Sequence, residues 1–266
     1  MPTVEYSFTE LCNLLGKKYS PEELSKSIPM IGVGLEEINE EKLVVEVFPN
    51  RPDYLSLEGF ARALKGFLSI ETGLPAYSVK PSGIKFYVEK SVKEVRPALA
   101  VGVAKGVDLS DEQTLISLMN IQEKLHLTHG RNRAKVAIGV HDLDKVVAPF
   151  TYKAVEPDSV KFVPLDMTEK LSLKQILSRH PKGRDYAWIL EGKTKYPLFV
   201  DANGDVLSFP PIINGELTRL REETRNLFLD LTGTSQLAVE QALNIICCGL
   251  ADRGAEIQSV EVIYRD

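Results

Sequence analysis

The chain of 266 residues is 44% apolar and carries a formal net charge of −5 at pH 7. That length exceeds one typical domain and that apolar fraction supports a folded core, so we expect two domains. The acidic balance argues against unspecific binding of nucleic acid over the whole surface, because contacts to phosphate need positive charge.

Composition excludes further classes of protein. No run of about 18 consecutive apolar residues is present, and residues 1–5 lack the basic and apolar pattern of a secretory signal, so we expect a cytoplasmic protein without a membrane partner. The three cysteines, Cys12, Cys247 and Cys248, lack the spacing of a zinc site or a disulfide framework. The four histidines are also scattered, and the sequence predicts no metal site.

The first 47 residues predict two helices followed by two strands. The ranges 7–15 and 20–28 each begin with a serine in a capping position, and the second adds a proline at the first helical position. Apolar alternation then predicts strands over 33–38 and 42–47.

Residues 48–62 form a distinctive stretch, Phe-Pro-Asn-Arg-Pro-Asp-Tyr-Leu-Ser-Leu-Glu-Gly-Phe-Ala-Arg. It predicts a turn over 50–53 and an amphipathic helix beginning at Ser56, whose apolar side chains recur every three to four residues. The polar residues of that turn have the composition of a catalytic cluster. They suit equally a turn that buried polar groups fix, or an interface.

Glycine and proline are dense over 73–83. We place a domain boundary there, between residues 1–80 and residues 81–266. The larger unit begins with predicted strands over 84–88 and 98–104 and a predicted helix over 110–125.

The chain then reaches a basic loop at 129–135 and a buried strand over 136–140, whose end presents His141 and Asp142. A His-Asp pair suggests general-base chemistry. Adjacent residues of a strand point to opposite faces, however, so these two would not pair directly, and a strand-end turn is the alternative.

The region after residue 150 mixes loops and short strands. We expect a helix over 171–178, a basic loop over 179–184 and a hairpin over 195–208 that turns at Asn203-Gly204.

Two apolar stretches between residues 207 and 234 each carry polar residues near an end. Adjacent prolines favour a strand over 209–213 that breaks off into a loop. A second strand over 226–231 presents Asp230 and Thr232 just before a glycine turn, where strand ends often carry functional side chains. Alternatives remain at both places. Asn214-Gly215 suits a simple turn, and Asp230 and Thr232 suit capping of the next helix.

A predicted helix over 235–249 and a predicted strand over 258–264 complete the chain. Strands and helices interleave around antiparallel hairpins. The expected fold class is therefore α+β, with a small α/β module followed by a larger mixed-sheet domain.

Three stretches carry a family resemblance. Ser-Phe-Pro-Pro-Ile-Ile-Asn-Gly at 208–215 and Asn-Leu-Phe-Leu-Asp-Leu-Thr-Gly-Thr at 226–234 resemble the editing module of the phenylalanyl-tRNA synthetase beta subunit in its archaeal and eukaryotic form. Residues 48–62 resemble the N-terminal module signature of the same family. With Ala-Ile-Gly-Val-His-Asp at 137–142 between them, the resemblance covers nearly the whole chain. Since the sequence stops near the end of the editing module, we expect an N-terminal fragment.

The resemblance implies that a positioned water hydrolyses tyrosine wrongly attached to the phenylalanine tRNA. It assigns Leu198 and Phe209 to the wall around the aromatic ring and Asn214 to the ester or the attacking water. It assigns polar recognition of the tyrosyl group to Ser208, Asp230 and Thr232. The chain has no Gly-x-Ser-x-Gly elbow, so Ser208 is not expected to act as an esterase-type nucleophile.

The family also implies partners: tRNA(Phe) and a synthetase alpha subunit, in an alpha2beta2 assembly. No cofactor is expected in these residues, because the ATP and Mg²⁺ of the complete synthetase serve aminoacylation, which belongs to the alpha subunit. Candidate contacts to tRNA are Arg131, Arg133, Lys135 and Arg219, although solvated loop charge would explain them as well.

Two other functions remain open. The first is a noncatalytic tRNA-binding or subunit-assembly module with a vestigial pocket. The second is a free-standing deacylase that acts in trans, which the module at 48–62 disfavours, because the family uses that module in the larger assembly.

Overall fold

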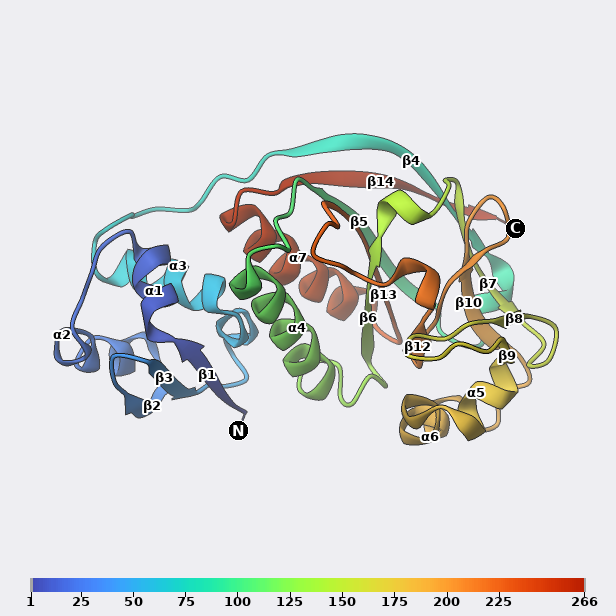
Figure 1. Ribbon diagram of the computed structural model, residues 1–266, viewed down its shortest axis with the longest axis horizontal. Coiled ribbons are helices and arrows are strands. Elements are labelled where there is room, and N and C mark those ends of the chain that lie inside the picture. The colour runs from blue at the N-terminus through green and yellow to red at the C-terminus, as the bar shows by residue number, and fades with distance from the viewer. Residues whose placement is uncertain (1, 266) are drawn as a thin grey trace.

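A computed structural model of the chain describes residues 2–265. The N-terminal elements lie at one end of the long axis (Figure 1). They form a three-stranded antiparallel sheet in the order β1-β3-β2, with helices beside it. The elements of this N-terminal part are β1 (Thr3–Ser7), α1 (Phe8–Leu15), α2 (Pro21–Ser25), β2 (Gly34–Ile38), β3 (Lys42–Glu46) and α3 (Leu57–Phe67).

Local capping signals explain where these helices begin and end. Ser7 and Ser56 accept hydrogen bonds from the first turns of α1 and α3, and Gly16 ends α1 in the left-handed conformation at φ 74°. Ser20 forms the expected capping box at α2. The prediction that this helix reaches Ile28 is wrong, because α2 ends at Ser25 and a short 3-10 turn follows.

The rest of the chain forms a nine-stranded mixed sheet in the order β12-β11-β10-β7-β4-β14-β5-β13-β6, so the predicted mixed-sheet α+β class is confirmed. Its strands are β4 (Val79–Glu89), β5 (Ala98–Lys105), β6 (Val136–Asp142), β7 (Phe150–Val155), β10 (Tyr196–Val200), β11 (Val206–Phe209), β12 (Ile213–Asn214), β13 (Asn226–Gly233) and β14 (Glu256–Arg265). The remaining elements are α4 (Glu112–Leu127), β8 (Lys161–Phe162), β9 (Leu171–Ser172), α5 (Leu173–Arg179), α6 (Pro181–Tyr186) and α7 (Gln236–Asp252).

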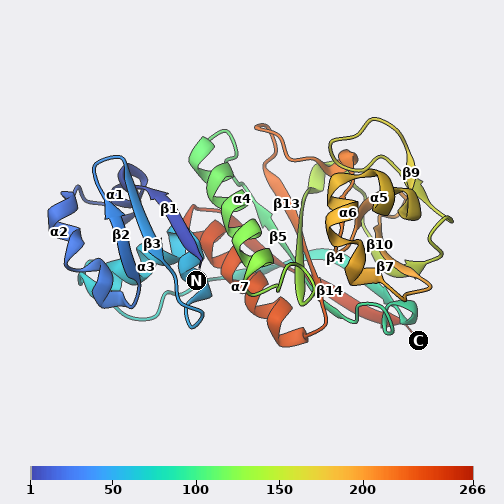
Figure 2. The ribbon, with the colours of Figure 1, turned by 90° about the horizontal axis from the view of Figure 1, so that it is seen from below.

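Helices α4 and α7 lie side by side between the N-terminal part and this sheet (Figure 2). Successive side chains of β13 point to opposite faces of the sheet, and each face packs into its own apolar core. Leu227, Leu229 and Leu231 belong to the core under the helices, whereas Phe228 belongs to a second core on the other face. The first core continues without interruption into the N-terminal part. The boundary at residue 80 therefore stays a prediction.

The sheet curls until its two edge strands meet. Strands β12 and β6 stand at opposite ends of the strand order, yet the Asn214 side-chain amide donates a hydrogen bond to the backbone oxygen of Val140 at 3.2 Å. The second core, which contains Phe86, Phe150 and Phe228, lies inside the curl. We call the junction of β12 with β6 the seam.

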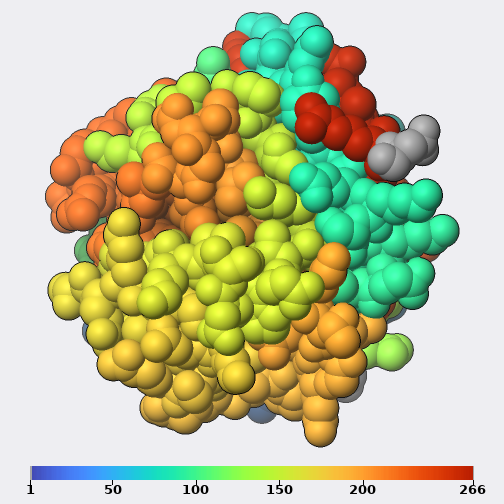
Figure 3. Space-filling view, turned by 90° about the vertical axis from the view of Figure 1, so that its right-hand side faces the viewer, coloured from blue at the N-terminus to red at the C-terminus, as the bar shows by residue number. Residues whose placement is uncertain are grey.

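The end of the molecule opposite the N-terminal part is built from the middle of the chain. Figure 3 shows residues in yellow and orange over most of this face, with β4 in blue-green beside them. Helices α5 and α6 belong to this region. The basic segment 179–184 is thus no loop, because α5 ends at Arg179 and α6 begins at Pro181.

Two further strand predictions are corrected. The segment Lys80 to Gly83 continues strand β4 in spite of its proline and glycine, and the register shifts where it pairs with β14. The predicted strand over 209–213 is split, since β11 ends at Phe209 and β12 begins at Ile213 after a turn. The hairpin over 195–208 is confirmed, with Gly204 at φ 85° in its loop.

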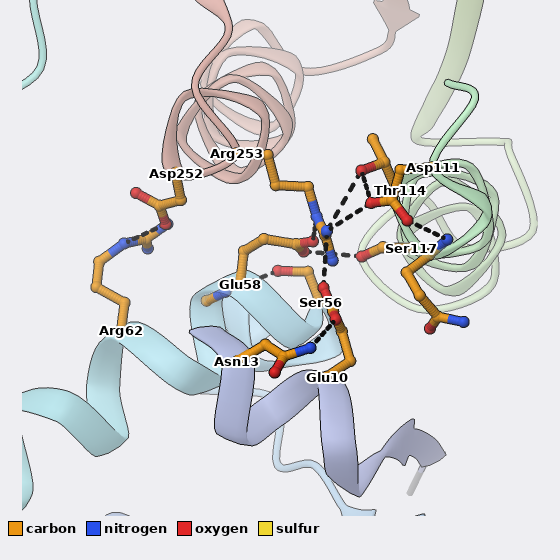
Figure 4. Close-up of polar contacts among 12 residues, drawn as sticks. Glu10, Asn13, Ser56, Glu58, Arg62, Asp111, Thr114, Ser117, Asp252 and Arg253 are labelled. Carbon is orange, nitrogen blue, oxygen red and sulfur yellow. Dashed lines mark hydrogen bonds and ion pairs between the residues drawn. The ribbon is translucent and has the colours of Figure 1, made fainter. Parts of the chain in front are cut away.

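A buried ionic cluster ties the N-terminal part to the helices of the larger part. Arg253 at the end of α7 contacts Glu58 of α3 and donates a 3.0 Å hydrogen bond to Glu10 of α1 (Figure 4). Its guanidinium also lies 3.5 Å from Asp111, which caps α4. One cation therefore joins four helices, and its side chain is only 10% exposed.

No helix within residues 2–265 is long and apolar enough to cross a membrane.

Candidate functional site

A cavity of about 420 Å³ lies at the seam. Its walls carry apolar side chains from α4, β6, β12 and the segment before β13, its floor is polar, and its rim carries charges of both signs. The apolar lining is Leu115, Met119, Ile138, Ile213 and Leu220. The polar floor is Ser208, Thr218 and Asp230, and Asn214 lies on the wall. The charged residues of the lining are Arg133, Lys182 and Arg219 together with Glu123 and Asp166. We call this space the seam cavity.

Asp230 is the centre of the floor. Its Oδ2 atom lies 2.7 Å from His141 Nε2 and accepts a 3.1 Å hydrogen bond from Ser208 Oγ. All three side chains are buried, with Asp230 2% exposed. A buried carboxylate needs such donors, because an unpaired charge away from water is costly.

Gly139 makes room for this carboxylate. It stands directly opposite Asp230 in the pairing of β6 with β13. A Cβ atom at Gly139 would lie 2.7 Å from both carboxylate oxygens, which is closer than real Cβ atoms approach. The absence of a side chain at this position therefore allows Asp230 to lie across β6 and face the seam cavity.

His141 is fully buried and contacts two side chains. Its Nδ1 atom lies 2.7 Å from Thr218 Oγ1, and its Nε2 atom contacts Asp230. The adjacent Asp142 points elsewhere and accepts a hydrogen bond from Thr224 Oγ1 at 2.8 Å. As expected for neighbours on a strand, His141 and Asp142 do not pair with one another.

Asn214 lies on the wall of the seam cavity and is half-buried. Its amide nitrogen donates a hydrogen bond to the backbone oxygen of Val140, and its side-chain oxygen has no hydrogen-bond partner within residues 2–265. The alternative of a simple turn at Asn214-Gly215 is wrong, because Asn214 pairs with Ser208 in the sheet and Gly215 has φ −77°. Gly215 is instead required for close packing, since a Cβ atom there would lie 2.7 Å from the Val206 oxygen.

The two residues predicted for the ring wall lie elsewhere. Leu198 and Phe209 are completely buried in a third apolar cluster, where Phe209 stacks on Tyr196 with ring centroids 5.7 Å apart. Neither lines the seam cavity. Its apolar wall includes Leu115 and Met119 of α4, which no local pattern in the sequence linked to the site.

Thr232 is buried beside a cation that the sequence did not single out. Arg96 donates a 2.8 Å hydrogen bond to Thr232 Oγ1 and a 2.7 Å one to the Thr232 oxygen. It also donates to the backbone oxygens of Arg133 and Ala134. Burial lowers the pKa of Arg96 to about 10, so the side chain stays charged at neutral pH. Thr232 therefore anchors Arg96 and does not line the seam cavity. It does not cap α7 either, since Ser235 precedes that helix.

The predicted contacts to tRNA divide into two groups. Arg133 and Arg219 line the seam cavity, but both are engaged within the protein. Arg133 donates to the Ile212 oxygen at 3.0 Å and lies 4.4 Å above the ring of Tyr186, so it braces the wall. Arg219 pairs with Glu216 and Asp166, and these carboxylates raise its pKa.

Arg131 and Lys135 lie outside the cavity lining, and Arg131 is exposed. Lys182 lines the cavity and has no ion pair within the described part of the chain. Its ammonium group lies 5.9 Å from the centre of the Tyr186 ring and contributes to the lowered pKa of Glu123.

A larger cavity of about 710 Å³ lies beside α3 in the N-terminal part. Its charges are paired with one another: Arg51 with Asp53 at 2.7 Å, and Arg62 with Asp252. Arg51 also stacks over the ring of Tyr54. The polar turn at 50–53 thus forms a braced surface, which favours the structural interpretation. No group of three side chains suited to a metal ion occurs within residues 2–265.

Two known domain families match the sequence. Residues 109–246 match the B3/4 domain, and residues 1–69 match the Phe-tRNA synthetase beta subunit B1 domain. The first range contains the whole seam cavity.

Individual relatives agree with these matches. The chain is 50% identical to the phenylalanine–tRNA ligase beta subunit of Archaeoglobus fulgidus and 48% identical to that of Methanococcoides burtonii, in each case over all of this chain and 48% of the relative. It thus spans about half the length of the curated relatives it matches. A crystal structure of an N-terminal fragment of the Pyrococcus horikoshii phenylalanyl-tRNA synthetase beta subunit superposes with a TM-score of 0.94 at 40% identity, covering all of this chain and 78% of that fragment.

Proposed function

The chain belongs to the family of phenylalanine–tRNA ligase beta subunits and carries a B3/4 domain, and from this we propose that the seam cavity is an editing site. Its substrate would be tRNA(Phe) wrongly charged with tyrosine. The reaction would be hydrolysis of the ester that joins the amino acid to the tRNA.

Physical limits on recognition explain why such a site is needed. A pocket shaped for phenylalanine rejects an analogue with one added hydroxyl only weakly, by about 10²-fold. A second site that binds the hydroxyl can select the wrong amino acid. It must be apolar around the ring and polar at the far end of the ring.

The single observation that carries the proposal is the composition of the seam cavity. Leu115, Met119 and Ile138 offer apolar contact to an aromatic ring, and the Asp230 carboxylate offers an acceptor for a phenolic hydroxyl. The volume of about 420 Å³ falls within the range of small-molecule sites. The tRNA itself would remain at the mouth, near Lys182.

The pattern of hydrogen bonds at the floor of the seam cavity favours hydrolysis by a positioned water over hydrolysis through a covalent intermediate. In a nucleophilic triad, histidine stands between the serine and the carboxylate. Here Ser208 and His141 both bond the carboxylate of Asp230, and no hydrogen bond joins Ser208 to His141 in the described residues. An aminoacyl ester is already activated, so Asn214 need only hold the attacking water, which can donate a hydrogen bond to its unpartnered oxygen.

Partners follow from the same family. We propose that the chain acts beside an alpha subunit in an alpha2beta2 synthetase that binds tRNA(Phe). Aminoacylation, with its ATP and Mg²⁺, would take place in the alpha subunit.

The test is release of tyrosine from preformed Tyr-tRNA(Phe), with Phe-tRNA(Phe) as control, by this chain and by the complete synthetase. The proposal expects the complete enzyme to clear only the tyrosyl ester, and Asp230→Asn to lower its preference for that ester while still binding tRNA. An intact tyrosyl ester after incubation with the complete enzyme would instead support a noncatalytic tRNA-binding or assembly module.

A further inference from the structure

The two oxygens of the Asp230 carboxylate have different surroundings. Oδ2 is bonded by both His141 and Ser208, at 2.7 and 3.1 Å. Oδ1 has no hydrogen-bond partner in the part of the chain that the structure describes. One oxygen is therefore fixed by the protein, and the other can accept a hydrogen bond from a ligand in the seam cavity.

The proton on His141 Nε2 follows from its neighbours. An ionised carboxylate only accepts hydrogen bonds, so Nε2 must carry a proton to bond Asp230. On the other side of the ring, Thr218 Oγ1 lies 2.7 Å from Nδ1 and can also donate to the Gly215 oxygen at 3.3 Å. Whichever way the Thr218 hydroxyl points, Nε2 remains the donor to Asp230.

Packing holds this arrangement in place. The imidazole is fully buried, and its ring lies 6.3 Å from the ring of Phe228 inside the curl of the sheet. Two positions earlier on β6, Gly139 leaves space for the carboxylate oxygens that a side chain would occupy. His141 therefore holds the carboxylate in the space that Gly139 leaves.

We propose that His141 is a positioning residue, which holds Oδ2 of Asp230 so that Oδ1 receives the hydroxyl of the substrate ring. The inference rests on the proposed editing function and deepens it, because it names what makes the site prefer a hydroxylated ring. His141 does not itself touch the substrate. It acts through Asp230.

The attachment of the substrate to tRNA explains why its ring end reaches Asp230. The ester links the amino acid to a nucleic acid that is far too large for a cavity of about 420 Å³. The ester and the amino group beside it therefore stay near the mouth. The far end of the side chain, which differs between tyrosine and phenylalanine, is the part that reaches the buried floor.

Two amide variants separate positioning from mere polarity. In His141→Gln the amide reaches about as far as Nε2 and can still donate to Asp230. In His141→Asn the amide is shorter and reaches only the position of Nδ1. Both side chains are neutral and polar. A difference in substrate preference between the two variants therefore reports whether the contact with Asp230 is kept.

The experiment measures kcat/KM for hydrolysis of Tyr-tRNA(Phe) and Phe-tRNA(Phe) by the complete synthetase. We expect His141→Asn to lower the preference for the tyrosyl ester about 10- to 100-fold, the range for losing a hydrogen bond to a charged group, while His141→Gln keeps most of it. When Asp230 is already replaced by asparagine, His141→Asn should lower the preference for the tyrosyl ester no further, because the carboxylate through which His141 acts is absent.

Other results would overturn the inference. Equal loss of both substrates in His141→Asn, an unchanged preference, or additive losses in the double variant would each show that His141 does not act through Asp230. If wild-type enzyme clears neither ester, the proposed function itself fails, and the inference with it. If His141→Asn does not fold, as judged by circular dichroism, Thr218→Val decides: we expect it to loosen the imidazole and lower the same preference, and an unchanged preference would reject the inference.

Discussion

The Asn214 side chain joins the two edges of one sheet, because its Nδ2 atom donates a hydrogen bond to the Val140 oxygen across the seam at 3.2 Å. The two residues stand on the first and last strands of the nine-stranded order. The seam cavity lies where the sheet closes, so this contact both joins the two edges and borders the site.

Removal of the Asn214 amide should affect activity much more than stability. We expect Asn214→Ala to abolish clearance of Tyr-tRNA(Phe), while the free energy of unfolding falls by only about 1 kcal/mol, the usual contribution of one hydrogen bond. Urea unfolding and tyrosine release measure the two effects. Asn203→Ala, in the exposed hairpin loop, is the control and should change neither. Normal clearance by Asn214→Ala would show that the catalytic role belongs to another residue.

A methyl group at Gly139 should displace the Asp230 carboxylate. In Gly139→Ala the new Cβ atom would meet the carboxylate oxygens at 2.7 Å, so the flexible end of the side chain must move. We expect loss of the preference for the tyrosyl ester, with the fold retained. Gly66→Ala in α3 is the matched control, since its Cβ atom has space and alanine is the better helix former. Wild-type preference in Gly139→Ala would mean that the position of Asp230 does not matter.

The ionic cluster of Arg253 should dominate the coupling of the two parts of the molecule. Arg253→Met leaves Glu58, 4% exposed, without its cation, and a buried charge that loses its partner costs about 3 kcal/mol or more. Chemical unfolding followed by circular dichroism measures this loss. Lys80→Met breaks a pair whose side chains are 62% and 40% exposed, so it should destabilise the protein much less than Arg253→Met. Equal losses of stability in Arg253→Met and Lys80→Met would show that the Arg253 cluster does not couple the two parts.

Arg133 and Arg131 should respond differently to neutralisation. Arg133→Gln removes the brace on the Ile212 oxygen, so we expect reduced clearance and lower stability. Arg131 is exposed, and Arg131→Gln should leave stability unchanged and weaken tRNA binding, with a shallower dependence of affinity on salt. Filter binding at several salt concentrations distinguishes the two. Unchanged tRNA affinity in Arg131→Gln would remove Arg131 from the predicted contacts.

Stability should fall in mild acid because of His126. Its Nε2 atom accepts a 2.8 Å hydrogen bond from the Ile138 amide, and burial lowers the pKa of His126 to about 4. The ordinary value is about 6.5, so between pH 6.5 and 4 the unfolded chain binds a proton that the folded chain does not. Stability is therefore complete above pH 6.5 and is lost as the pH falls, by on the order of 3 kcal/mol near pH 4.

The control for this effect is His126→Gln, whose oxygen can still accept from the Ile138 amide. Unfolding midpoints in urea at pH 7, 5 and 4 should fall more steeply for the wild type than for the variant. Carboxylates titrate in both proteins, so the difference between the two curves isolates His126. Parallel curves would show that the proton on His126 has no effect on folding.

Local sequence determined much of the framework. The capping serines Ser7, Ser20 and Ser56 mark where helices begin, because each cap bonds donors within its own first turn. The hairpin over 195–208 and the strand that carries Asp230 were predicted from turn residues and from apolar patterning, which also act over a few neighbouring residues. The motifs at 48–62, 208–215 and 226–234 indicated the family, which the comparisons confirm.

Tertiary structure alone decided which side chains share the site. His141 and Asp230 are 89 positions apart, and only the pairing of β6 with β13 brings them together. Leu115 and Met119 reach the cavity because α4 packs beside the seam, whereas Leu198 and Phe209, predicted for that wall, lie in a separate cluster. Capping and alternation act over a few residues, so they fix each element. The curl of the sheet acts over the whole chain, so it selects the residues of the site.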